Sequence, residues 1–180
     1  MKKLLKTLPL LALILLFTAS VGHAQSATGT TSVTVNVAAE AALTVASPTA
    51  LTAIGSVFNN YTGSTLVTYF IRTKQSTGSG TISLQVTTDF SPAGGPSVGT
   101  PPTAGDALKY TCSGAAPATP CTGSQPASTG SSSPVASFGA DAHTTTTAGS
   151  TVTTSWTLTN DPVYKTGAYS ATVTFTISAS

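Results

Sequence analysis

An antiparallel β-sandwich is the fold that this sequence predicts. In several short segments apolar residues stand at every second position, which puts one face of a strand in a core and the other in water. Clusters of Gly, Pro, Asn and Ser separate these segments and are typical of turns. Beyond residue 24 the Ala-rich stretch 37–43 is the one candidate for a helix, and strand patterns surround it. Short alternating strands joined by turns favour an all-β sandwich.

The first 24 residues predict a secretory signal peptide. Lys2, Lys3 and Lys6 precede an apolar run at 8–17, and the small residues of Gly22-His23-Ala24 follow it. This order of charge, apolar run and small-residue exit marks a cleaved export signal. The run is shorter than the roughly 20 residues that cross a bilayer. We therefore expect a secreted protein that is not inserted in a membrane after the signal is removed.

The remaining chain carries four cations against five acids. The cations are scattered along it, at Arg72, Lys74, Lys109 and Lys165. Nucleic acid and anionic membranes are bound by clustered Lys and Arg, so we expect neither partner. The length suits a single core. We divide the chain into a signal peptide (1–24), an N-terminal extension or first strand (25–40) and a sandwich domain (41–180).

Five segments have the alternation of strands. They are 33–37, 66–72, 82–86, 152–158 and 169–177. Segment 66–72 is apolar on both faces, which predicts a central strand covered on each side. In segment 169–177 the apolar residues Val173, Phe175 and Ile177 face inward and Thr residues face outward. This last segment is the longest uninterrupted alternation in the chain.

Segments rich in Gly, Ser and Pro predict the connections. The Ser/Gly link between Lys74 and Thr81 predicts a hairpin. Residues 91–107 and 113–150, rich in Gly, Pro, Ser, Thr and Ala, predict long surface loops.

Cys112 and Cys121 lie in CSGAAPATPC. An exported protein meets an oxidising compartment, in which such a pair closes. A redox or metal site needs CxxC spacing or further ligands. We predict a structural disulfide between these two residues.

The sequence gives little support to catalysis. Ser97 in GPSVG matches the GxSxG letters of serine hydrolases, but that chemistry needs a strand, a sharp turn and a helix, and Thr100-Pro101-Pro102 follows instead. His143 is the one histidine left after the signal is removed. We expect no enzyme, and no catalytic or cofactor-binding residues.

Two kinds of metal site are candidates. Asp141 and His143 could supply two ligands if others converged on them. Calcium is the other alternative, because carboxylates from separate turns can form its site, and four aspartates lie at predicted loops: Asp89, Asp106, Asp141 and Asp161. Their spacing matches no EF-hand, and we expect no metal.

Six aromatic residues form the remaining candidate group: Tyr61, Tyr69, Tyr110, Trp156, Tyr164 and Tyr169. They are candidates for a sugar-binding platform. Most stand in strand alternation with aliphatic neighbours, which favours core or half-buried positions.

Four stretches resemble, in this order, the spore-coat-protein-U-like, pilin-like subunits of bacterial chaperone–usher fibres. They are TSVTVNVAAEAALTVASPTALTAIG, TISLQVTTDF, LKYTC and VTTSWTLTNDPVYKTGAYSATVTFTIS. Within the last, GAYSATVTFTIS is similar to the family's closing strand, Gly-x-Tyr followed by alternating Thr and apolar residues.

The resemblance implies an immunoglobulin-like sandwich that lacks one strand and receives it from the next subunit. In β-strand addition, main-chain hydrogen bonds give pairing and alternate side chains fill pockets. Val33, Val35 and Val37 would be the donor residues, and Val173, Phe175 and Ile177 part of the acceptor wall. The implied partners are other copies of the chain or related subunits, with a periplasmic chaperone and an outer-membrane usher, and the implied location is the cell surface, reached through the periplasm.

Two alternatives stay open. Residues 31–37 have the pattern of an ordinary first strand as much as that of a donor. Trp156-Thr157-Leu158 resembles the WxL signature of cell-wall-attached proteins, which keeps a wall-binding or carbohydrate-binding adhesin as the second function. The sequence thus predicts a non-catalytic structural subunit of a surface fibre, pilus or coat.

Overall fold

The computed structural model describes residues 27–180, and the predicted signal peptide lies outside these residues. The chain divides into two units, 1–35 and 36–180. Every strand of the described residues belongs to the second unit, and these residues contain no helix. The all-β prediction is confirmed.

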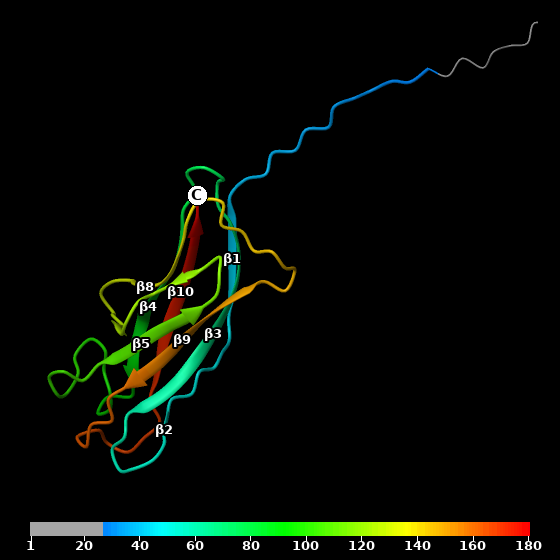
Figure 1. The fold of residues 1–180 in the computed structure, drawn as a ribbon. Helices are drawn as coiled ribbons and strands as arrows, with labels where there is room; N and C mark the ends of the chain where they lie inside the picture. Colours follow the sequence, from blue (N-terminus) through cyan, green and yellow to red (C-terminus); the bar gives the residue numbers. More distant parts are fainter. Residues whose placement is uncertain (1–26) are drawn as a thin grey trace, which may run out of the picture. The chain divides into compact units, whose positions relative to one another are not determined.

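Two antiparallel sheets form the sandwich (Figure 1). The first has the order β1 (Glu40–Val45), β3 (Tyr61–Arg72), β9 (Ser150–Leu158), β5 (Leu108–Gly114) and β7 (Gln125–Pro126), with β2 (Thr52–Ala53) paired to β3. The second has the order β10 (Ser170–Ala179), β4 (Gly80–Ser91), β8 (Ser133–Phe138) and β6 (Thr119–Pro120).

The core lies between the inward faces of these sheets. Alternation fills it as predicted: in β9 the buried residues are Val152, Thr154, Trp156 and Leu158, and in β4 they are Ile82, Leu84 and Val86. One aromatic pair joins the two sheets, with ring centroids 5.2 Å apart for Tyr69 of β3 and Phe138 of β8. A second pair lies within the first sheet, with ring centroids 5.3 Å apart for Tyr110 of β5 and Trp156 of β9. Burial of these large rings supplies much of the packing.

The predicted hairpin between Lys74 and Thr81 is wrong. β3 pairs with β1 and β9 in the first sheet, whereas β4 pairs with β10 and β8 in the second. The link therefore crosses from one sheet to the other. Both strands send an apolar face inward, and that pattern is the same for two strands of a hairpin and for two strands in facing sheets.

Two further predictions need correction. Residues 113–150 were expected to be loop, yet they contain β8, in which Val135 and Phe138 are buried at 0% and 4% exposure. Pro134 and small residues hide its alternation. β3 is central, as expected, but its outer face is open, because Leu66 and Phe70 are 45% and 43% exposed.

The segment before β1 does not form a first strand within the sandwich. Residues 27–39 belong to no strand in the described part of the chain, and the first strand begins at Glu40. β1 overlaps the Ala-rich stretch 37–43, the helix candidate, and it is a strand whose Leu43 and Val45 pack against the core. Pairing with β3 decided its conformation over the weak helix preference of its alanines.

Candidate strand-acceptor groove

The two flanks of the sandwich are built differently. At one flank the short edge strands β6 and β7 contain Pro120 and Pro126, which cannot donate to a further strand. The predicted disulfide is confirmed there: Cys112 in β5 is bonded to Cys121, which follows β6, with Cα atoms 5.3 Å apart. It links the two sheets, so this flank is covalently closed.

At the other flank the edge strands are β1 and β10. β10 pairs with β4 on one side only, and its ten residues, SATVTFTISA, contain neither a proline nor a charge. Long uncharged edges of this kind readily add another strand. β1 and β10 lie side by side at this flank without pairing.

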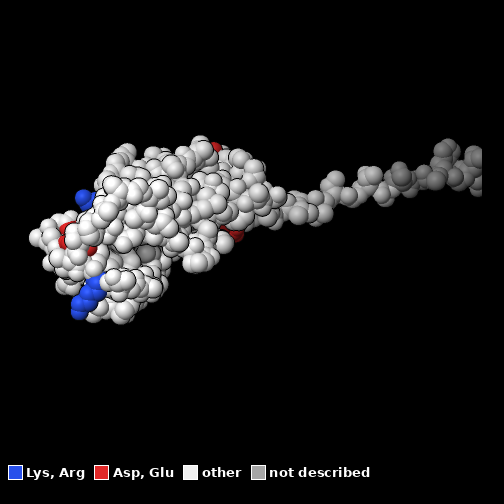
Figure 2. All heavy atoms as spheres, turned by 90° about the horizontal axis from the view of Figure 1, so that it is seen from below, with Lys and Arg blue, Asp and Glu red and all other residues white. Residues whose placement is uncertain are grey.

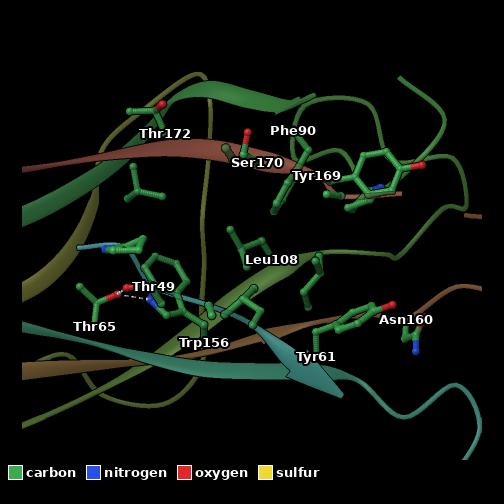
Figure 3. Close-up of a pocket in the computed structure, with 18 of the residues that line it drawn as sticks. Thr49, Tyr61, Thr65, Phe90, Leu108, Trp156, Asn160, Tyr169, Ser170 and Thr172 are labelled. Atoms are coloured by element: carbon green, nitrogen blue, oxygen red, sulfur yellow. Dashed lines mark hydrogen bonds between the residues drawn. The ribbon is translucent and has the colours of Figure 1, made fainter. Parts of the chain in front are cut away.

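An open groove of about 940 Å³ enters the core between these edges. Its floor includes the core residues Leu108, Trp156 and Leu158. Val45 and the chain that follows β1 form one wall, and Val173 and Phe175 of β10 belong to the other. Figure 3 shows Phe90 and Tyr169 on one side of the space and Leu108 and Trp156 on the other.

The groove exists because β1 stops early. After Val45, only the Ala46 amide continues the ladder, donating to the Leu66 carbonyl at 2.9 Å. The chain then runs beside β3, where a Cβ on Gly63 would collide with the Ala50 carbonyl oxygen. A buried hydrogen-bond chain fixes the floor below: the Trp156 indole donates to Thr65 Oγ1 at 2.8 Å, and that oxygen lies 2.6 Å from Thr49 Oγ1 (Figure 3).

Aromatic side chains line the end of the groove that is formed by loops. Tyr61, Phe90, Tyr164 and Tyr169 belong to its lining. The Tyr169 ring packs so closely on Gly95 that a Cβ there would collide with it, and its hydroxyl donates to the Lys165 carbonyl at 2.7 Å. These contacts fix the Tyr169 ring directly before β10 begins.

Asp89 holds the loop behind this entrance. Its carboxylate accepts hydrogen bonds from the Ser97 hydroxyl and the Val98 amide, both at 2.7 Å, and from the Gly99 amide at 3.0 Å. Partial burial acts to raise the pKa of Asp89, but the hydrogen bonds outweigh it and hold the pKa below its ordinary value. The Ser97 hydroxyl is therefore engaged in a hydrogen bond that holds a loop, and no helix follows this residue.

Asp161 lies in another loop at the same end of the groove. Hydrogen bonds from the Thr103 side chain and the Val163 amide lower its pKa. The neighbouring Tyr164 hydroxyl donates to Asp106 Oδ2 at 2.8 Å, and burial together with this carboxylate raises the Tyr164 pKa. These carboxylates thus already accept protein hydrogen bonds.

The predicted strand-exchange residues fall as follows. Val173 and Phe175 line the groove, whereas Ile177 faces the same way farther along β10 and packs against the core outside the groove lining. Val33, Val35 and Val37 are 92%, 80% and 58% exposed. The chain thus has three exposed, alternating valines as well as an open groove with an apolar floor.

The other candidate sites are dispersed. His143 Nδ1 lies 2.7 Å from the Asp141 carbonyl oxygen and 3.8 Å from its carboxylate. Among residues 27–180 no group of three or more His, Cys, Asp or Glu could hold a metal. The six aromatics split into the core residues Tyr69, Tyr110 and Trp156, of which Trp156 also reaches the groove floor, and the groove residues Tyr61, Tyr164 and Tyr169.

Sequence reasoning missed the groove floor and part of its entrance. Leu108 begins a strand that was not predicted, although it alternates with Tyr110. Phe90 ends β4 beyond the segment that was recognised. Alternation identifies an inward face, but which inward residues border a gap depends on where the opposite edge strand stops.

Within residues 27–180 no helix has the length and apolar character needed to cross a membrane. Comparison with protein-family models, with curated proteins and with solved structures finds no match for this chain.

Proposed function

We propose that this protein is a non-catalytic structural subunit of a secreted surface fibre, pilus or coat, and that its copies join by β-strand addition. The observation that carries the proposal is the open groove, with its floor of apolar core residues, beside the uncharged edge of β10. Val33, Val35 and Val37 of another copy would fill it, while their backbone pairs with β10. Before assembly the exposed edge needs cover, which a periplasmic chaperone would supply before an usher exports the subunit.

Magnitudes support this assignment. Fully burying one valine contributes about 1.5–3 kcal/mol, and these three are largely exposed. Ordering a residue of backbone costs about 1–2 kcal/mol. The valines therefore roughly offset the ordering of the five-residue segment, and the new main-chain hydrogen bonds add to this. Assembly should accordingly depend strongly on each inward-facing side chain of the donor.

The matched test exploits the alternation of the donor. V33D/V35D places two charges on its inward face, whereas T34D/N36D places the same charges on its outward face. We expect wild type and T34D/N36D to form ladders on unheated denaturing gels, and V33D/V35D to remain a folded monomer. Equal ladders from all three chains would contradict the proposal. A wild-type monomer that V33D/V35D destabilises would instead identify residues 31–37 as this domain's own first strand.

A carbohydrate-binding or wall-binding adhesin is the second candidate. Tyr61, Tyr164 and Tyr169 line the same groove as the polar side chains of Asn160 and Asp161, and aromatic and polar groups together suit a sugar. Wild-type monomer that pellets with purified cell wall, and that loses this property in Tyr61→Ala, would favour this function.

A further inference from the structure

The link between the three valines and the sandwich is very short. Only Ala38 and Ala39 separate Val37 from Glu40, where β1 begins. Two extended residues span at most about 7 Å. Arg72 holds both sides of this link, since its Nε donates to the Ala38 carbonyl at 2.8 Å and its Nη2 lies 2.9 Å from the Glu40 carboxylate. Wherever Val37 binds, the sandwich that carries it must lie directly beside that place.

The groove has its entrance at one end of the sandwich. Here we call this end the tip, formed by the loops 54–60, 92–107 and 159–169 (lower end in Figure 1). Tip residues of the lining include Phe58, Asn160 and Tyr164, and the Asn160 side chain donates to the Asn59 carbonyl at 3.0 Å. Away from the tip, β1 lies beside β10, and the opening between the two sheets is narrower there. A seated donor therefore leaves the groove at the tip.

We propose that a second interface accompanies strand exchange: the tip of the accepting copy contacts the opposite end, the base, of the donating copy. This inference rests on the proposed function, and its occupant is a second copy of the chain. A donor strand antiparallel to β10 and a two-residue link bring tip and base together. Because the two surfaces differ, the contact repeats head to tail and gives a filament.

The tip has the chemistry of a contact surface. Ile54, Val57 and Phe58 are 79%, 82% and 54% exposed on one short loop, and clustered exposed apolar residues mark interaction sites. The loop is firmly held, because the Asn59 amide nitrogen Nδ2 donates to the Ile54 carbonyl at 2.8 Å. Phe58 has a φ of 59°, a conformation that bulky residues rarely adopt and that a fixed loop must impose.

The base offers a depression beside the link. A hollow of about 360 Å³ lies where the link joins the sandwich. Its walls come from three segments: residues 37–39, residues 72–75, and Asp141 with His143. With Val37 seated in the groove of the next copy, Ala38 and Ala39 are the apolar part of this lining, and the other walls are polar or charged. An apolar side chain from the 54–58 loop would lie against the two alanines.

Cross-linking of the full-length exported chain tests this contact. The variant V57C/Q75C carries one new thiol at the tip and one at the base, both at exposed positions. The two native cysteines of the described chain are joined in a disulfide. The control V57C/S155C moves the second thiol to the outer face of β9, where Ser155 is also exposed. A short thiol–thiol cross-linker is added to each, and the samples are boiled in detergent with reductant.

We expect V57C/Q75C to give a covalent ladder that survives boiling, and V57C/S155C to give monomers. Ladders in unheated samples that boil to monomers in both variants would overturn the tip-to-base contact and leave strand exchange intact. Absence of ladders in unheated wild type would overturn the proposed function, and the second interface with it.

Discussion

Asp89 shows how a single side chain shapes the groove entrance. Its carboxylate gathers donors from residues 8 to 10 positions later in the chain. The loop that it closes carries Gly95, on which the Tyr169 ring packs. The ionised carboxylate of Asp89 thus connects the end of β4, the loop that follows it and the beginning of β10.

Protonation of Asp89 should loosen this loop. Its folded-state pKa lies below the ordinary 3.8, so the ionised form contributes stability above that value, which is lost as the pH falls through the lower folded pKa. We expect wild type to be more stable than Asp89→Asn at about pH 6, and the difference to shrink below about pH 4. Thermal melts across this range check it, and a difference that stays constant down to about pH 2.5 would contradict it.

At the residue scale the sequence predicted side chains whose role depends on a simple pattern. The Cys112–Cys121 pair followed from export and spacing, and closing such a loop contributes about 2–3 kcal/mol. The inward direction of Val173 and Phe175 followed from alternation. The hydrogen bonds of Asp89 could not be predicted, because the sequence of a loop does not show whether backbone amides converge on its aspartate.

The two faces of β10 have different surroundings. Its inward residues are partly buried and its outward residues are exposed along the whole strand. Thr174 on the outer face lies 2.9 Å from the Thr87 hydroxyl of β4, whereas Val173 faces the groove. Substitutions at these two neighbouring residues can therefore distinguish a loss of donor binding in the groove from a loss of stability of the strand.

Lysine should block assembly at the first of these positions and not at the second. Val173→Lys places a long charged side chain at the groove wall, from which it can extend to water, so the fold survives while the donor is excluded. Thr174→Lys puts the same charge on the outer face. We expect the first variant to lose ladders on unheated gels and the second to keep them, and circular dichroism confirms folding. Equal ladders in the two variants would be inconsistent with a donor at this groove.

The periodic elements were predictable, and their partition between sheets was not. β9, β4 and β10 have clear alternation and were recognised, whereas β8 was taken for loop. Nothing in the Ser/Gly link after β3 distinguishes a hairpin from a crossover. Residues 33–37 have the alternation of a strand, yet pair with no strand of the described chain. A strand needs a partner, and the sequence alone does not say in which chain the partner lies.

For the sandwich as a whole, the decisive feature is the contrast between its flanks. Prolines and a disulfide close one side, and an uncharged edge with an open, apolar-floored groove forms the other. Charges are sparse on the face of the molecule that Figure 2 shows. The groove results from the early end of β1 and the edge position of β10 together, so no local stretch of sequence could reveal it.

Trp156 offers the most direct test of the central claim, that the groove binds residues 33–37 of another copy. It is the one tryptophan of the chain and lies on the groove floor. A peptide spanning residues 28–40 is titrated into the V33D/V35D chain, which has an intact groove and a disabled donor. The control is the same peptide carrying Asp at positions 33 and 35.

The measurement is Trp156 fluorescence, with thermal melts on the same samples. The account predicts a saturable change and a stabilisation of about 2.7 kcal/mol at a hundredfold excess over Kd, which is a rise in Tm of roughly 5–10 °C. The control peptide should do neither. An unchanged signal and Tm, or an equal response to both peptides, would contradict donor binding at this groove.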